Sequence, residues 1–198
     1  MTPTPPRISL ARHGETEWTI SGQHTGRSDI PLTARGEQNA LGLGARLKGE
    51  TFVEVFSSPL TRARRTCELS GFAGACHLDP DLMEWDYGQY DGKTSAEIRR
   101  GRPDWDIFRD GCPGGESVAD VAARADRVVA RLRAAGGDVL VFSHAHFLRV
   151  LAARWLGMPA DGARLFVLGT ASLSVLGYDR TPDRPVIRLW NDDRHVTT

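Results

Sequence analysis

The chain has 198 residues, 40% of them hydrophobic and 25% charged, a balance typical of a globular protein with a sizeable core. Lysine plus arginine and aspartate plus glutamate number 25 each, so no net charge draws the chain toward nucleic acid or an anionic membrane. Any anion site must therefore be a local concentration of cationic side chains.

The sequence also bears on where the protein resides. No apolar stretch approaches the roughly 18 residues that a membrane span needs, and the amino-terminal residues lack the apolar run of a signal peptide. The three cysteines are odd in number and show no CxxC spacing, which is typical of reduced, buried thiols. We therefore expect a cytoplasmic protein.

The first third of the chain predicts two strands and two helices. "ISLA" at 8–11 reads as a short buried strand, and a helix is expected after it with Thr33 as N-cap. "TFVEVFSS" predicts the second strand. In "SPLTRARRTCELSG" we expect Ser58 to cap a second helix, with Pro59 as its first residue.

The middle of the chain, roughly 80 to 115, is rich in aromatic residues, glycine and proline. It predicts a single short helix at 94–100. Long irregular segments in compact domains often cover a functional site. We therefore expect residues 85–115 to form a substrate-covering loop.

The last third contains the clearest helix of the chain. Apolar residues from Val118 to Leu132 repeat at helical spacing, with Ser117 as N-cap and Asp120 three residues later. "DVLVF" predicts a buried strand, "FLRVLAARWLGM" a helix, and residues 164–179 and 185–192 two final strands. The alternation of strands and helices predicts one α/β domain over 1–198, a doubly wound, mainly parallel sheet with helices on both faces.

Two of the predicted strands end in functional residues. Arg12 and His13 follow "ISLA", and His144 closely follows "DVLVF". Ligands of open α/β sheets bind beyond the carboxyl ends of the strands, so these side chains should meet if the strands are neighbours. Arg62 lies in the first turns of the helix after the second strand. Together these residues form an anion pocket, for which phosphate is the natural ligand.

The residue types in this pocket suit phosphoryl transfer. An imidazole such as His13 can attack phosphorus and form a phosphohistidine. A second imidazole, His144, would stabilise the phosphoryl oxygens if it were cationic, together with the arginines. Glu84, at the edge of the covering loop, is the candidate for protonating the leaving alkoxide.

His144 and His146 form an H-x-H pair, a spacing that recurs in metal sites, so metal binding is an alternative interpretation. Zinc needs three or four protein ligands, and no aspartate follows this pair at usable spacing. We therefore expect no metal and place His146 in the lining of the pocket. His24 is expected at the surface.

These residues resemble the histidine phosphatase superfamily, which includes the cofactor-dependent phosphoglycerate mutases. The resemblance rests on "LARHGET", "SGQHTGRSDIPLTARGEQNA", "SSPLTRARRT", "EWDYGQYDG" and "SHAHFLR". It implies a phosphoglycerate mutase-like fold with His13 as the phosphorylated nucleophile. It also implies that Arg12, Arg62 and His144 form the phosphate pocket and that Glu84 donates the proton.

Departures from the mutase pattern favour the phosphatases of the superfamily. Mutases carry asparagine six residues after the nucleophile, where this chain has Thr19, and an arginine of an "R-x-Y-G" stretch where it has Trp85. They also have a longer insertion before the second histidine. The motifs are similar to those of bacterial acid phosphatases and of sedoheptulose-1,7-bisphosphatases, and the shorter covering loop favours the former.

The sequence therefore predicts a metal-independent phosphomonoester hydrolase without a cofactor, acting on small phosphorylated metabolites. A phosphoglycerate mutase, a sedoheptulose or fructose bisphosphatase and a non-catalytic phosphate-binding module remain alternatives. Aromatic residues at 85–108 and the lack of further arginines favour a broad range of leaving groups or a weakly charged one. By resemblance, a homodimer through an edge strand is plausible. The expected substrate-binding residues are Gln23, Thr25, Gly26, Trp85, Tyr87 and His146.

Overall fold

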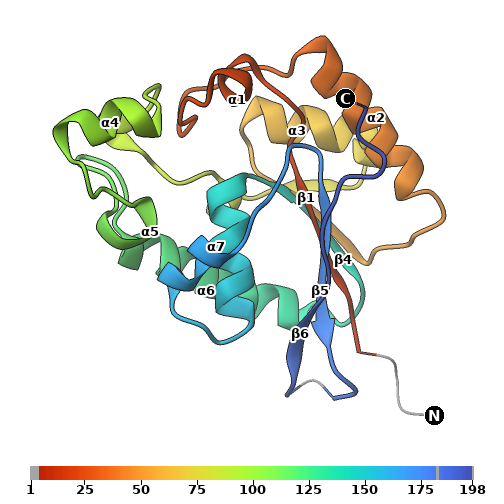
Figure 1. Cartoon of the computed structure of the whole chain (residues 1–198). Helices are drawn as coiled ribbons and strands as arrows, with labels where there is room; N and C mark the ends of the chain where they lie inside the picture. Colours follow the sequence, from red (N-terminus) through yellow and green to blue (C-terminus); the bar gives the residue numbers. More distant parts are fainter. Residues whose placement is uncertain (1–4, 182, 198) are drawn as a thin grey trace.

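The protein, described here from a computed structural model covering residues 5–181 and 183–197, is built on one six-stranded sheet (Figure 1). The strand order is β3-β2-β4-β1-β5-β6. The strands are β1 (Ile8–Arg12), β2 (Glu54–Ser57), β3 (Cys76–Leu78), β4 (Val139–Ser143), β5 (Leu173–Tyr178) and β6 (Pro185–Asp192).

The sheet is mainly parallel, as predicted. Strands β1, β2, β3 and β4 run parallel to one another, whereas β5 is antiparallel to both β1 and β6. The connection from β5 to β6 is short, which permits an antiparallel hairpin but not a parallel crossover. The mostly parallel α/β architecture predicted from the sequence is therefore confirmed.

Helices cover both faces of the sheet. On β4, Val139 and Val141 join the cluster that contains α6 and α7, whereas Leu140 and Phe142 join the cluster that contains α2 and α3. This alternation follows from the period of two along a strand and explains why β4 is apolar throughout. The helices are α1 (Glu17–Ser21), α2 (Ala34–Arg46), α3 (Thr61–Cys67), α4 (Ser95–Gly101), α5 (Ile107–Asp110), α6 (Val118–Ala134) and α7 (Ala145–Trp155).

The predicted helix starts at Thr33 and Ser117 are confirmed. The Thr33 hydroxyl accepts a hydrogen bond from the Gly36 amide, and Ser117 forms a capping box with Asp120. In each case, the cap residue and its partner lie within one turn of each other. Local sequence is therefore enough to identify them.

The predicted start of α3 is wrong. The helix begins at Thr61, so neither Ser58 nor Pro59 occupies the expected position. Asp29, from a loop distant in sequence, accepts hydrogen bonds from the Thr61 amide and hydroxyl at 2.8 and 2.6 Å. This carboxylate satisfies the free N–H group at the helix start and leaves the Ser58 hydroxyl available to the site.

The segment 80–115 is more structured than predicted. The expected short helix is present as α4, but α5 and two 3-10 turns, η2 (Pro80–Leu82) and η3 (Gly88–Tyr90), accompany it. Figure 1 shows α4 and α5 lying to one side of the sheet. The short edge strand β3 was not predicted either, because three residues are too few for a periodicity signal.

Candidate active site

The two strand-end histidines meet at the carboxyl edge of the sheet. Strands β1 and β4 are parallel neighbours, and their register pairs Arg12 with Ser143. His13 and His144 are the next residues on each chain segment, and their ring centroids are 5.1 Å apart. The sequence-based expectation that they share one edge is confirmed.

His13 is held as a neutral imidazole with one nitrogen free. Its ring is almost fully buried, and Nδ1 lies 2.7 Å from the carbonyl oxygen of Gly14, which can only accept a hydrogen bond. This contact assigns the proton to Nδ1 and leaves a lone pair on Nε2. Burial lowers the pKa of His13 well below its usual value, and the charges of Arg62 and Arg12 lower it further.

Arg62 is fully buried and makes four hydrogen bonds. Its Nη atoms donate to the carbonyl oxygens of Ser28, Thr25 and Gly26 at 2.9 to 3.0 Å. Its Nε donates to Nδ1 of His144 at 3.2 Å. Arg62 therefore ties the 25–28 loop to the second histidine.

His144 is neutral in this arrangement. Because Arg62 donates to Nδ1, the ring proton lies on Nε2, which contacts the Ser58 hydroxyl at 2.8 Å. Burial and the charge of Arg62 lower the pKa of His144 well below its usual value. The free site therefore does not contain the cationic second imidazole considered from the sequence.

Removing the Arg62 side chain is expected to destabilise the fold. Arg62→Ala leaves two buried carbonyls and one partly buried carbonyl without a donor, and we expect it to lower the free energy of unfolding by roughly 3 kcal/mol. Arg64 of the same helix is half exposed, and Arg64→Ala should cost less than about 0.5 kcal/mol. Urea denaturation of both variants checks this, and equal losses would contradict it.

Arg12 presents a buried donor without a protein partner. Its Nη1 donates to the carbonyl oxygen of Leu168 at 2.6 Å, whereas Nε is inaccessible to solvent and has no hydrogen bond within the described residues. Burial lowers the pKa of Arg12 to about 10, so the guanidinium remains charged at neutral pH. An unsatisfied cationic donor at this place suits an anionic ligand.

Glu84 lies at the amino-terminal end of α7. Its carboxylate accepts hydrogen bonds from the backbone amides of Trp85 and Phe147 at 2.9 Å and of His146 at 3.1 Å. The side chain of the N-cap residue, His144, does not cap the helix, so Glu84 supplies the acceptor from another segment. The helix therefore fixes the carboxylate beside the cavity.

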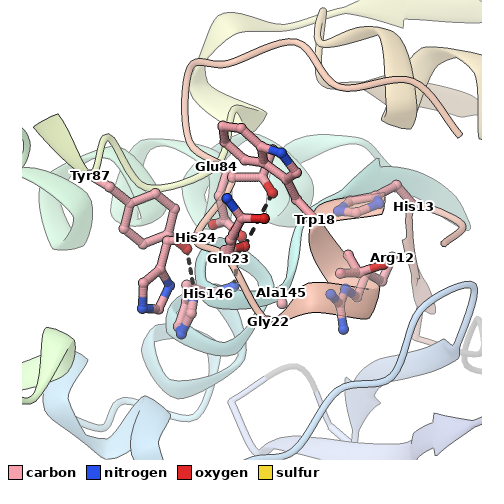
Figure 2. A pocket seen from close by; sticks show the side chains of 12 residues that line it. Arg12, His13, Trp18, Gly22, Gln23, His24, Glu84, Tyr87, Ala145 and His146 are labelled. Carbon is pink, nitrogen blue, oxygen red and sulfur yellow. Dashed lines mark hydrogen bonds between the residues drawn. The ribbon is translucent and has the colours of Figure 1, made fainter. Parts of the chain in front are cut away.

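A cavity of about 190 Å³ joins these groups (Figure 2). Figure 2 shows Arg12 and His13 on one side and Tyr87, His24 and His146 on the other. Of the residues expected at the site, those that line the cavity are Arg12, His13, Gln23, Thr25, Glu84, Tyr87 and His146.

The other four expected residues do not line this cavity. Arg62 and His144 are buried next to His13. Trp85 is fully buried in the core, where its ring lies against Phe108 and its indole N–H donates to the Glu116 carbonyl. Trp85 was expected among the substrate-binding residues, but here it packs the core.

Gly26 is the fourth of these residues. It does not line the cavity, but its lack of a side chain lets residues 85–87 pack closely against it. A Cβ atom there would lie 2.8 Å from the Tyr87 ring and 3.0 Å from the Trp85 carbonyl oxygen. Its amide donates to Asp91 and its carbonyl accepts from Arg62. A side chain at this position would displace the backbone segment that carries Trp85 and Tyr87.

The prediction for His24 is wrong, because its ring lines the cavity instead of the surface. The imidazole packs against Tyr87 at 4.8 Å and His146 at 5.8 Å between ring centroids. Burial lowers its pKa to about 4. Its position between Gln23 and Thr25, both expected at the site, was the signal in the sequence. The other unpredicted lining residues are Trp18, Thr19, Gly22 and Ala145.

Within residues 5–181 and 183–197, no three histidine, cysteine, aspartate or glutamate side chains are grouped closely enough to hold a metal ion. His144 and His146 in particular make different contacts, one with Ser58 and the other with Tyr87. No helix of the same residues is long and apolar enough to cross a membrane.

The profile of the histidine phosphatase superfamily, branch 1, matches residues 8–193. The chain belongs to this family. An acid phosphatase of Mycobacterium tuberculosis is 41% identical over 179 residues, 87% of each chain. A sedoheptulose 1,7-bisphosphatase of Saccharomyces cerevisiae is 38% identical over 186 residues, 77% of this chain and 68% of the relative. A probable phosphoglycerate mutase of Salmonella choleraesuis is 35% identical over 188 residues, 88% and 86% of the two chains.

A solved structure of a Mycobacterium tuberculosis open reading frame has the same fold as this histidine phosphatase. It superposes with a TM-score of 0.90 at 37% identity and covers 94% of this chain and 97% of the other. The phosphoglycerate mutase-like fold and the superfamily predicted from the sequence are confirmed. With the names of the relatives, the family makes this protein a phosphoric monoester hydrolase acting on small phosphorylated molecules.

Proposed function

We propose that this histidine phosphatase hydrolyses phosphate monoesters through a phosphohistidine formed on His13. The observation that carries the proposal is the free, neutral Nε2 of a buried histidine that lines a cavity shared with Arg12 and Glu84. A nucleophile, an anion-binding cation and a carboxylate are the three groups that the reaction needs.

The first step transfers the phosphoryl group to the protein. Nε2 of His13 attacks phosphorus, and the bond from phosphorus to the leaving oxygen breaks. Arg12, which lines the cavity, neutralises charge on the phosphoryl oxygens with its guanidinium. Glu84, protonated before the step, gives its proton to the departing alkoxide so that the alcohol leaves neutral.

The second step returns the free enzyme. The carboxylate of Glu84 takes a proton from water, the water oxygen attacks phosphorus, and the bond to Nε2 breaks. Inorganic phosphate leaves, and Glu84 again holds the proton that it needs for the next cycle. Arg62 and His144 position the 25–28 loop and the His13 ring during both steps.

We propose that the leaving group lies on the side of the cavity formed by Tyr87, His24 and His146 (Figure 2). The Tyr87 hydroxyl and Nδ1 of His146 are 2.5 Å apart, so the two side chains hold one another in place. Gln23 and Thr25 line the same cavity. Tyr87 belongs to the 85–115 segment, which we propose covers the substrate.

Phosphate release from a substrate panel tests the function. p-Nitrophenyl phosphate, sugar bisphosphates, sugar monophosphates and 3-phosphoglycerate are assayed with and without a chelator. We expect release with an unchanged rate in chelator, since every proposed role falls to a protein side chain. Loss of activity in chelator that one metal restores would contradict the proposal, as would phosphoglycerate isomerisation stimulated by 2,3-bisphosphoglycerate without net release.

The pH profile of kcat/KM should contain no inflexion from the ionisation of His13. Attack requires the neutral imidazole, and burial lowers the pKa of His13 well below its usual value, so no inflexion from this histidine is expected near pH 6.5. In Glu84→Gln, which removes the proton donor as a second source, any inflexion near this pH should belong to the second ionisation of the substrate phosphate, whose pKa is about 6. It should therefore move when an aryl phosphate replaces an alkyl phosphate. An inflexion fixed near pH 6.5 for both substrates would contradict the assignment.

A further inference from the structure

A second cavity adjoins the catalytic one. It encloses about 220 Å³ and shares His24 and His146 with the catalytic cavity. The centroids of these two rings are 5.8 Å apart. The two imidazoles therefore lie between the cavities, and a molecule bound at His13 reaches the second cavity only by extending past them.

Three arginines from distant parts of the sequence line the second cavity: Arg99 of α4, Arg149 of α7 and Arg164 of the turn η4 (Ala160–Leu165). The expectation that no further arginines lie near the site is therefore wrong, because nothing in their spacing shows that the fold brings them together. Among the lining residues that the structure describes, Asp106 is the one carboxylate. The cavity is therefore strongly cationic in a chain whose total charge is zero.

The three arginines differ from most others in the described part of the chain. Thirteen arginines lie within 4.0 Å of a carboxylate, and none of these three is among them. Arg99 and Arg149 use Nε to donate to the carbonyls of Trp105 and Ala163, each at 3.1 Å. Their terminal Nη groups make no hydrogen bond to residues that the structure describes.

Arg149 is the least exposed arginine of the cluster. Its guanidinium lies over the Phe108 ring, 4.5 Å from the centroid, and is partly buried. Burial lowers its pKa, whereas Glu84, Tyr87 and Asp106 raise it. A desolvated guanidinium with free, forked donors is suited to a planar or tetrahedral anion.

We propose that Arg99, Arg149 and Arg164 form a second anion subsite, so that the preferred substrate carries another phosphate or a carboxylate on its leaving group. This inference rests on the proposed function and specifies its substrate class. The phosphoryl group that is cleaved sits at His13 and Arg12, while the retained anion occupies the arginine cavity.

Matched substrate pairs test the subsite. Propane-1,3-diol bisphosphate and hexane-1,6-diol bisphosphate are compared with the corresponding monophosphates, and 3-(phosphonooxy)propanoate reports on a carboxylate. We expect kcat/KM to favour the doubly anionic ester by roughly tenfold or more at one chain length. The phosphate and carboxylate compounds then identify which anion the subsite prefers.

Variants link this preference to the arginines. Arg164→Gln and Arg99→Gln, both at exposed positions, should each lower the preference several-fold, mainly through KM. Arg100→Gln is the matched control, since Arg100 is the next residue on α4 and does not line the cavity. Equal rates for both members of each pair, or the same loss in Arg99→Gln and Arg100→Gln, would overturn the subsite.

Failure of the subsite and failure of the proposed function are distinguishable. If monophosphates are hydrolysed without any preference, the proposed function stands and the subsite is refuted. If no ester is hydrolysed, the proposed function fails. Calorimetric binding of propane-1,3-bisphosphonate then tests the subsite alone: weaker binding to Arg164→Gln than to Arg100→Gln supports it, and equal binding refutes it.

Discussion

Replacing His13 with alanine is expected to lower kcat for phosphate ester hydrolysis by at least about 10⁴-fold. The reason is the direct chemical role of Nε2, for which no nearby group of the described chain can substitute. The other histidine in contact, His144, has Nδ1 occupied by Arg62 and its Nε2 proton directed at Ser58. Initial rates with p-nitrophenyl phosphate measure the effect.

The control for this prediction is His77→Ala. His77 lies on the edge strand β3 with a side chain that is 68% exposed, so the variant should retain the wild-type rate. Circular dichroism of both variants verifies that they are folded. A His13→Ala enzyme that kept more than about one hundredth of the wild-type rate would exclude the covalent route.

Replacing Glu84 with glutamine should lower kcat by roughly 10² to 10⁴-fold for alkyl phosphates. An alkoxide is a poor leaving group, so its departure depends on the proton. A p-nitrophenolate departs without protonation, and the first step with p-nitrophenyl phosphate should be much less affected. The glutamine side chain retains one oxygen to accept hydrogen bonds from the amides at the start of α7.

Pre-steady-state kinetics separates the two roles of Glu84. With p-nitrophenyl phosphate, Glu84→Gln should give a burst of nitrophenol followed by slow turnover, because water activation in the second step is lost. Glu50→Gln serves as the control, since Glu50 is exposed and precedes the amino end of β2, whereas the site lies at the carboxyl edge of the sheet. Equal rate losses for alkyl and aryl esters in the first step would contradict the assignment of Glu84 as proton donor.

The regular elements could be predicted where the deciding interactions are local. The apolar run of β4, the periodicity of α6 and the caps at Thr33 and Ser117 each depend on residues within a few positions of one another. The prediction of where α3 begins failed because Asp29, more than thirty residues earlier, accepts the hydrogen bond from the first helical amide. Short elements such as β3 and α5 carry too few residues for a pattern.

The site divides in the same way. Arg12, His13 and His144 could be placed because each lies at the end of a recognisable strand, and parallel neighbours bring such ends together. Part of the surroundings could not be placed from the sequence. His24 and the cluster of Arg99, Arg149 and Arg164 come from four separate segments, and only the tertiary structure shows that they share one wall.

The measurement that tests the central claim most directly is capture of the phosphoryl group on the protein. The enzyme is mixed with excess p-nitrophenyl phosphate, quenched in alkaline denaturant to preserve phosphohistidine, and digested for mass spectrometry. The account predicts a phosphoryl group on His13 that forms and decays at rates compatible with turnover, and that accumulates in Glu84→Gln. Turnover without any phosphorylated His13, or with the phosphoryl group on another residue, would contradict it.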